Sequence, residues 1–138
     1  MIEKTFSCDG VTITVRESTR RDRANRFAMQ VKLGVDGEPP EDALEADRFY
    51  NKRVFIGQVS RVSAAEGLPF ALPSPADDAA ALEAAFEAWL DLPERLIDAW
   101  TEAASAVEGP ALPAAGPGGS LEDADPLAEA GASASAPT

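Results

Sequence analysis

The sequence changes character after Gly109, and this change limits the part of the chain that can fold. Residues 110–138 are dominated by Ala, Pro, Gly, Ser and acidic residues, and their only large apolar side chains are three isolated leucines. Ordering each residue costs about 1–2 kcal/mol, whereas burying one leucine returns only about 1.5–3 kcal/mol. We therefore expect residues 110–138 to be a disordered acidic tail and residues 1–109 to form one domain.

Charge is unevenly distributed along the chain. Residues 1–61 carry nearly all of the 12 basic residues, while residues 62–109 carry only Arg95 among many acidic residues. The net charge of −12 argues against nucleic-acid binding, because phosphate contacts need a basic surface. No apolar run has the length of a membrane span or a signal peptide, so we expect no membrane contact and a cytoplasmic location, which for a viral protein is the host cytoplasm.

The residue types needed for catalysis are scarce. The chain has no histidine and one cysteine, Cys8, which removes the usual general base, any internal disulfide and a four-cysteine zinc site. Three pairs of acidic residues fit the solvated faces of the expected helices: Asp77/Asp78, Glu83/Glu87 and Glu94/Asp98. We interpret the basic run as a set of ion-pair partners for these acidic helices: Arg20, Arg21, Arg23 and Arg26. The sequence thus predicts a protein that is not an enzyme, with no catalytic residue, metal site, cofactor or small-molecule substrate.

The N-terminus carries the pattern of a β-hairpin. Asp9-Gly10 lies between the expected strands Thr5–Cys8 and Val11–Arg16, and Asp-Gly favours a two-residue turn in which both residues take positive φ. Apolar and polar residues alternate from Val11 to Arg16, which predicts one buried and one solvated face.

The first expected helix runs from Ser18 or Thr19 to Leu33, with Gly34 as its left-handed C-terminal residue. Its apolar stripe at i, i+3, i+4 and i+7 predicts a face directed to the core: Ala24, Phe27, Ala28 and Val31. Met29 and Leu33 then lie on nearly the opposite side of the helix.

A second helix is expected from Pro40 or Glu41 to Val59. One face carries Leu44, Phe55, Val59 and, beyond the helix, Val62, while Phe49 and Ile56 lie more than a quarter-turn away. The alternative interpretation is that Val54–Val62 forms a strand.

Two further helices are expected after the proline-rich loop Gly67–Pro75. Ser74, Pro75 and Asp77 have the spacing of a helix start, and Pro93 begins the last helix, which Gly109 ends. Their expected core residues are Leu82, Ala85, Phe86 and Trp89 in the third helix and Leu96, Trp100, Ala103 and Val107 in the fourth. The short link between them predicts an antiparallel helical hairpin. The fold class is therefore α+β, mostly α, with an N-terminal hairpin and about four helices.

Four large apolar side chains are left over from this assignment of the core: Met29, Leu33, Phe49 and Ile56. Apolar groups that gather on a surface tend to mark interaction sites. We predict that these four residues bind a partner protein, with the alternative that both helices are buried on two sides.

Three segments resemble the tail assembly chaperones of long-tailed bacteriophages and prophages. They are TFSCDGVTITVRESTRRDR near the start, EGLPFALPSP in the middle, and AAFEAWLDLPERLIDAWTEAASAVEGP. The resemblance covers about residues 3–111 and rests on hydrophobic and turn patterns, so it transfers no catalytic residue.

The resemblance implies a function in virus assembly. Such chaperones bind the long helical tape-measure protein, keep it soluble and help to recruit tail-tube subunits. An alternative from another class is a minor structural protein of the virion, either a tail or a head–tail accessory subunit.

The composition of residues 110–138 yields a first prediction. A chain that ends at Gly109 should melt cooperatively within a few degrees of the full-length protein in a calorimetric scan. The reason is that residues 110–138 have no regularly spaced apolar side chains that could pack on the domain. A large drop in melting temperature would show that the tail contributes to the core.

Overall fold

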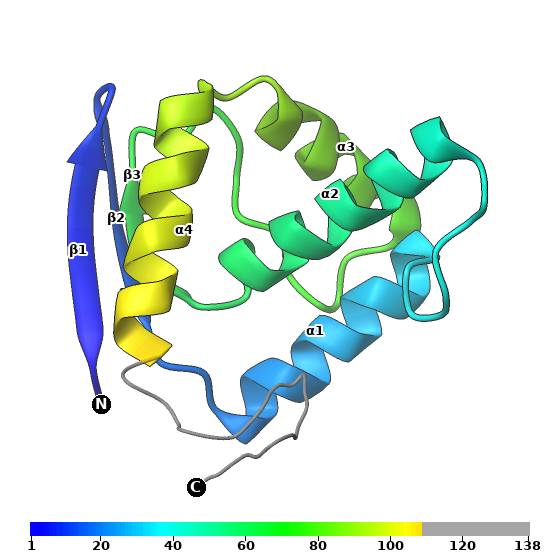
Figure 1. Cartoon of the computed structure of the whole chain (residues 1–138). Coiled ribbons are helices and arrows are strands. Elements are labelled where there is room, and N and C mark those ends of the chain that lie inside the picture. The colour runs from blue at the N-terminus through cyan, green and yellow to red at the C-terminus, as the bar shows by residue number, and fades with distance from the viewer. Residues whose placement is uncertain (109–138) are drawn as a thin grey trace, which may run out of the picture. The chain divides into compact units, whose positions relative to one another are not determined.

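The computed structural model describes residues 1–108, so Gly109 and the expected disordered tail lie outside the described residues. The described part is a three-stranded antiparallel sheet with four helices, which confirms the expected α+β class (Figure 1). In chain order the elements are β1 Glu3–Cys8, β2 Val11–Arg16, α1 Arg20–Leu33, α2 Ala43–Val59, β3 Val62–Glu66, α3 Ala79–Leu90 and α4 Glu94–Glu108.

The N-terminal hairpin forms as expected, and a third strand extends it. Asp9 and Gly10 have φ of 53° and 79° in the turn, and Cys8 pairs with Val11 beside it. The unexpected strand β3 pairs antiparallel with β2, with a bulge between Thr14 and Val15. A Cβ on Gly67, which follows β3 and has φ of 87°, would lie 2.3 Å from the Gly10 carbonyl oxygen, so this close approach requires glycine.

The two faces of the sheet differ in chemistry. Val11, Ile13 and Val15 are buried toward the helices, which all lie on one side of the sheet in Figure 1. The other face carries hydroxyl pairs across the hairpin, with Oγ1 of Thr5 and Thr14 separated by 2.7 Å. This alternation is the pattern expected for a sheet with one solvated face.

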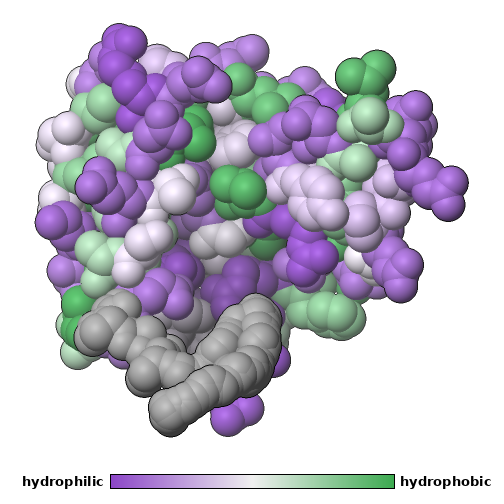
Figure 2. Space-filling model, in the orientation of Figure 1, coloured by the Kyte–Doolittle hydropathy of each residue, from purple (hydrophilic) through white to green (hydrophobic). Residues whose placement is uncertain are grey.

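Helix α1 begins and ends as expected, but the side of the helix that is buried is the opposite of the expected one. Thr19 caps its start in a capping box with Asp22, and Gly34 ends it with φ of 74°. The expected core stripe is wrong: Phe27 and Val31 are 59% and 48% exposed, Ala24 is exposed, and only Ala28 is half-buried. The buried side instead carries Met29 and Leu33, which face α2 and α3. Figure 2 shows mostly hydrophilic surface, with one light-green patch, in the part of the view where α1 runs.

The buried side of α1 contacts the sheet through one ion pair. Asp22 lies on the same side of the helix as Met29 and Leu33, and its buried carboxylate forms an ion pair with Arg16 at the end of β2. A buried carboxylate without a partner is costly. The ion pair with Arg16 offsets this cost, so the side of α1 that carries Asp22 can be buried together with Met29 and Leu33.

Helix α2 is helical through Val59, so the alternative strand at residues 54–62 is wrong, and β3 begins only at Val62. Its apolar residues are buried on more than one side: Phe49, Phe55, Ile56 and Val59. Leu44, expected in the core, is 84% exposed, because it lies in the first turn of α2, where no other element covers it.

Helix α3 begins later than expected. Asp78 caps it by accepting a hydrogen bond from the Ala81 N–H at 2.9 Å, and the helix starts at Ala79. The residues with the spacing of a helix start, Ser74 and Asp77, close a separate turn in which the Ser74 N–H donates to Asp77 at 3.0 Å. Lys32 of α1 holds this turn by donating to the Asp77 carbonyl at 2.8 Å.

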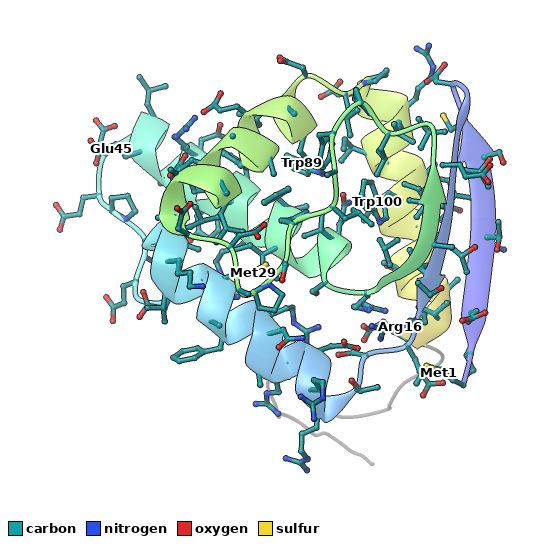
Figure 3. The ribbon with its side chains drawn as sticks, turned by 180° about the vertical axis from the view of Figure 1, so that it is seen from behind. Met1, Arg16, Met29, Glu45, Trp89 and Trp100 are labelled. Atoms are coloured by element: carbon teal, nitrogen blue, oxygen red, sulfur yellow. The ribbon has the colours of Figure 1, made fainter. Side chains whose placement is uncertain are left out.

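The expected core stripes of α3 and α4 are confirmed, since all of them are buried except the half-buried Ala85. The expected antiparallel hairpin is wrong. After the short turn at Asp91 and Leu92, α4 leaves α3 at a wide angle and runs along the sheet (Figure 1). Trp100 of α4 is thereby fully buried between the helices and the sheet, as Figure 3 shows.

Aromatic packing and one glutamine join α2 to the C-terminal helices. The ring centroids of Phe55 lie 5.6 Å from Phe86 and 5.7 Å from Trp89. The indole N–H of Trp89 donates to Gln58 Oε1 at 3.0 Å, and Gln58 Nε2 donates to Thr101 at 2.9 Å. Gln58 thus satisfies the polar atom that burial of Trp89 brings into the core.

The burial of α2 yields a prediction with a matched control on the same helix. Ile56→Asp should unfold the domain, because it places an unpaired carboxylate at a fully buried position. Leu44→Asp should leave the melting curve within a few degrees of the wild type, because that side chain is exposed. Circular dichroism melts distinguish the two, and a stably folded Ile56→Asp would contradict this packing.

Candidate partner-binding surfaces

The four residues predicted to bind a partner all belong to the hydrophobic core. Met29 and Ile56 are 1% and 0% exposed, so the expectation that they project away from the core is wrong. Both α1 and α2 are enclosed on the sides that carry these residues. Leu33 and Phe49 are also buried, but their remaining exposed surface lines a pocket that opens to solvent.

The pocket lies where α1 ends and α2 begins, and its volume is about 360 Å³. Leu33, Val35 and Phe49 supply its apolar lining. Charged side chains from the connection and from α2 stand around it: Glu38, Glu45, Arg48 and Lys52. Gly34 and Pro40 complete the wall. A small apolar hollow with a charged rim suits the insertion of one apolar group from a partner.

The two cations of this rim are held in place by α3. Lys52 Nζ lies 2.6 Å from Glu83, and Arg48 pairs with both Glu83 and Glu87. The Glu87 carboxylate also raises the pKa of Arg48 above its usual value. The acidic face of α3 is therefore paired with α2, and the expectation that the α1 arginines would pair with it is not met for Arg20, Arg21 and Arg23 within residues 1–108.

A second surface lies on the outward side of α1, and we call it the α1 outer face. It consists of the apolar stripe that was expected in the core together with exposed arginines: Arg20, Arg21, Arg23, Ala24, Phe27 and Val31. The spacing of apolar residues in the sequence identifies this stripe, but it does not show that the stripe faces solvent.

The contact between Arg16 and Asp22 positions this face. Arg16 Nη2 donates to Asp22 Oδ1 at 2.9 Å, and Arg16 Nη1 bonds the other oxygen. The Thr19 N–H also donates to Asp22, at 2.9 Å. The hydrogen bonds with Arg16, and to a smaller extent those with Thr19, lower the pKa of the Asp22 carboxyl to about 2. Figure 3 shows Arg16 at the end of β2, next to the start of α1.

The described part of the chain lacks both a cluster of metal-ligating side chains and a helix able to cross a membrane. Within residues 1–108, no group of three His, Cys, Asp or Glu side chains could hold a metal ion. The same residues contain no helix that is both long and apolar enough to cross a membrane. Burial and the neighbouring Asp9 raise the pKa of the Cys8 thiol, which lowers its thiolate fraction at neutral pH.

No protein-family model, no curated protein and no solved structure matches this chain.

The Asp22 site yields a pH prediction. The folded-state pKa lies below the ordinary value of 3.8, so this carboxylate stabilises the fold above about pH 4, and the stabilisation is lost as the pH falls toward 2. The loss should be about 2 kcal/mol, since one pKa unit corresponds to about 1.4 kcal/mol. Urea unfolding between pH 2 and 5 should therefore show a shallower pH dependence for Asp22→Asn.

The control is Asp98→Asn, which changes an exposed carboxylate on α4. Its pH dependence should follow that of the wild-type protein. Equal pH profiles for Asp22→Asn and the wild type would show that the ion pair with Arg16 does not form in solution.

Proposed function

We propose that this chain is a non-enzymatic binding protein that acts as a tail assembly chaperone of a long-tailed bacteriophage or prophage. It binds the tape-measure protein in the host cytoplasm, keeps it soluble and helps to recruit tail-tube subunits. The observation that supports the proposal is the open pocket with an apolar lining from Leu33 and Phe49. These are the two predicted partner-binding residues that a ligand can still touch.

The pocket suits a helical partner. A helix that lies in a groove is recognised through apolar anchors spaced along one of its faces. One apolar anchor of the partner helix can fill the hollow beside Phe49. The charged residues at the rim of the pocket then contact polar residues of the partner that flank this anchor. Arg48 and Lys52 are already fixed by α3, so their ordering adds little entropic cost when the partner binds.

The charge of the chain suits the second part of the proposed function. A tape-measure protein is long and helical, and it exposes apolar surface before assembly. A partner with a net charge of −12 adds strong repulsion between complexes and so opposes their aggregation.

Filling the pocket tests the proposal. Glu38→Trp places a large side chain at the rim without changing Leu33 or Phe49, and Glu38 is an exposed residue of the connection between α1 and α2. Glu102→Trp makes the same chemical change on the exposed side of α4, away from the pocket. Each variant is co-expressed with the tape-measure protein, and the soluble fraction of that protein is measured.

We expect Glu38→Trp to lower the soluble fraction several-fold and Glu102→Trp to leave it unchanged, with both variants folded by circular dichroism. If neither the wild type nor either variant changes the solubility of the tape-measure protein, the proposed function is wrong. Stoichiometric amounts of this chain in purified virus particles, measured by mass spectrometry, would instead support a minor structural protein.

A further inference from the structure

The α1 outer face combines exposed apolar side chains with exposed arginines. Arg20, Arg21 and Arg23 are exposed, and none of them forms an ion pair within residues 1–108. The only acidic residue of α1, Asp22, is turned inward and neutralised by Arg16. The face is therefore cationic, on a chain whose net charge is −12.

The apolar residues of this face form one line. Ala24, Phe27 and Val31 are spaced at i, i+3 and i+7, so they lie on the same side of the helix as the leading Arg20. At 100° per residue, Arg23 lies on one border of this line and Arg21 lies on the other. An exposed Phe and Val bordered by cations is an arrangement suited to an amphipathic ligand.

We propose that the α1 outer face binds an amphipathic helix whose apolar stripe is bordered by Asp and Glu residues. The inference rests on the proposed function only in taking the partner to be a helical protein, and it concerns a surface separate from the pocket. The partner's apolar side chains cover Phe27 and Val31, and its acidic borders meet Arg21 and Arg23. Charge complementarity of this kind sets orientation and speeds association.

The same face fits nucleic acids less well. A nucleic acid would meet the arginines, but its phosphate backbone leaves Phe27 and Val31 without an apolar contact. An acidic helix satisfies both the cations and the apolar line.

The size of the face sets the expected affinity. The 14 residues of α1 extend over about 21 Å. A single helix packed along this length buries less surface than a stable protein interface, so binding should be weak, with a dissociation constant in the micromolar range or above. Exposed ion pairs at its borders should make binding sensitive to salt.

Two synthetic peptides test the proposal. Both are helical and share the same leucine stripe, and their border positions are either all Glu or all Lys. Fluorescence anisotropy of the labelled peptides is measured with the full-length protein at about 50 mM and 300 mM salt. We expect the Glu-bordered peptide to bind about tenfold or more tightly at low salt, with a smaller difference at high salt.

Matched variants assign the binding to α1. Phe27→Asp should weaken binding of the Glu-bordered peptide at least tenfold, whereas Leu44→Asp, at the most exposed apolar position of α2, should leave it unchanged. Arg23→Glu should remove most of the preference for Glu borders. Lys4→Glu makes the same charge change on β1 and should preserve that preference.

Three results would overturn the proposal: equal binding of both peptides, loss of binding in Leu44→Asp but not in Phe27→Asp, or tighter binding of duplex DNA or anionic vesicles through Arg23. Failure here is distinguishable from failure of the proposed function. The peptides report on the α1 outer face, while the Glu38→Trp experiment reports on the pocket and on the tape-measure protein.

Discussion

The enclosure of α2 on more than one side is the constraint on which the rest of the structure depends. Phe49, Phe55, Ile56 and Val59 are directed to different neighbours, and each can be buried only if other elements surround the helix. Burying one such side chain contributes about 1.5–3 kcal/mol, so the arrangement that buries all of them is strongly favoured. Helices α1 and α3 both contact α2, and Phe86 and Trp89 pack on Phe55. These four side chains of α2 therefore belong to the core, and Phe49 also lines the pocket.

Local signals in the sequence predicted the elements that depend on local physics. Asp9-Gly10 specifies a turn with two positive φ values, and Gly34 ends α1 in the left-handed conformation. The apolar period of α4 identified its buried residues because one face of that helix is apolar and the other is polar. In each case the residues that carry the signal are also the residues that the structure uses.

The features that sequence reasoning missed depend on contacts between distant residues. Helix α1 has two apolar stripes, and periodicity does not show which of them is buried. The buried stripe shares its side of the helix with Asp22, whose carboxylate pairs with Arg16, and neither of these two charged residues stands out in the sequence. Strand β3 is short and contains two alanines, so it has no strand pattern of its own and forms by pairing with β2. The direction of α4 is likewise set by the sheet rather than by its short link to α3.

The wrong assignment of the buried side of α1 also affected the choice of the predicted partner-binding residues of this helix. The sequence pattern places Phe27 and Val31 in the core and Met29 and Leu33 at the surface, and the structure shows the inverse arrangement. The reasoning that apolar groups outside the core mark interaction surfaces still applies, but it now points to Phe27 and Val31. The pocket keeps part of the original assignment, since Leu33 and Phe49 line it.

The orientation of α1 is the central claim, and thiol reactivity tests it most directly. In a protein with Cys8→Ser, one cysteine is placed at Phe27 or at Met29, and the rate of labelling by a thiol reagent is measured under native conditions. The structure predicts fast labelling of Phe27→Cys and labelling of Met29→Cys only on unfolding, since the two positions are 59% and 1% exposed. Fast labelling of Met29→Cys with protection of Phe27→Cys would contradict the orientation of α1 and, with it, the α1 outer face.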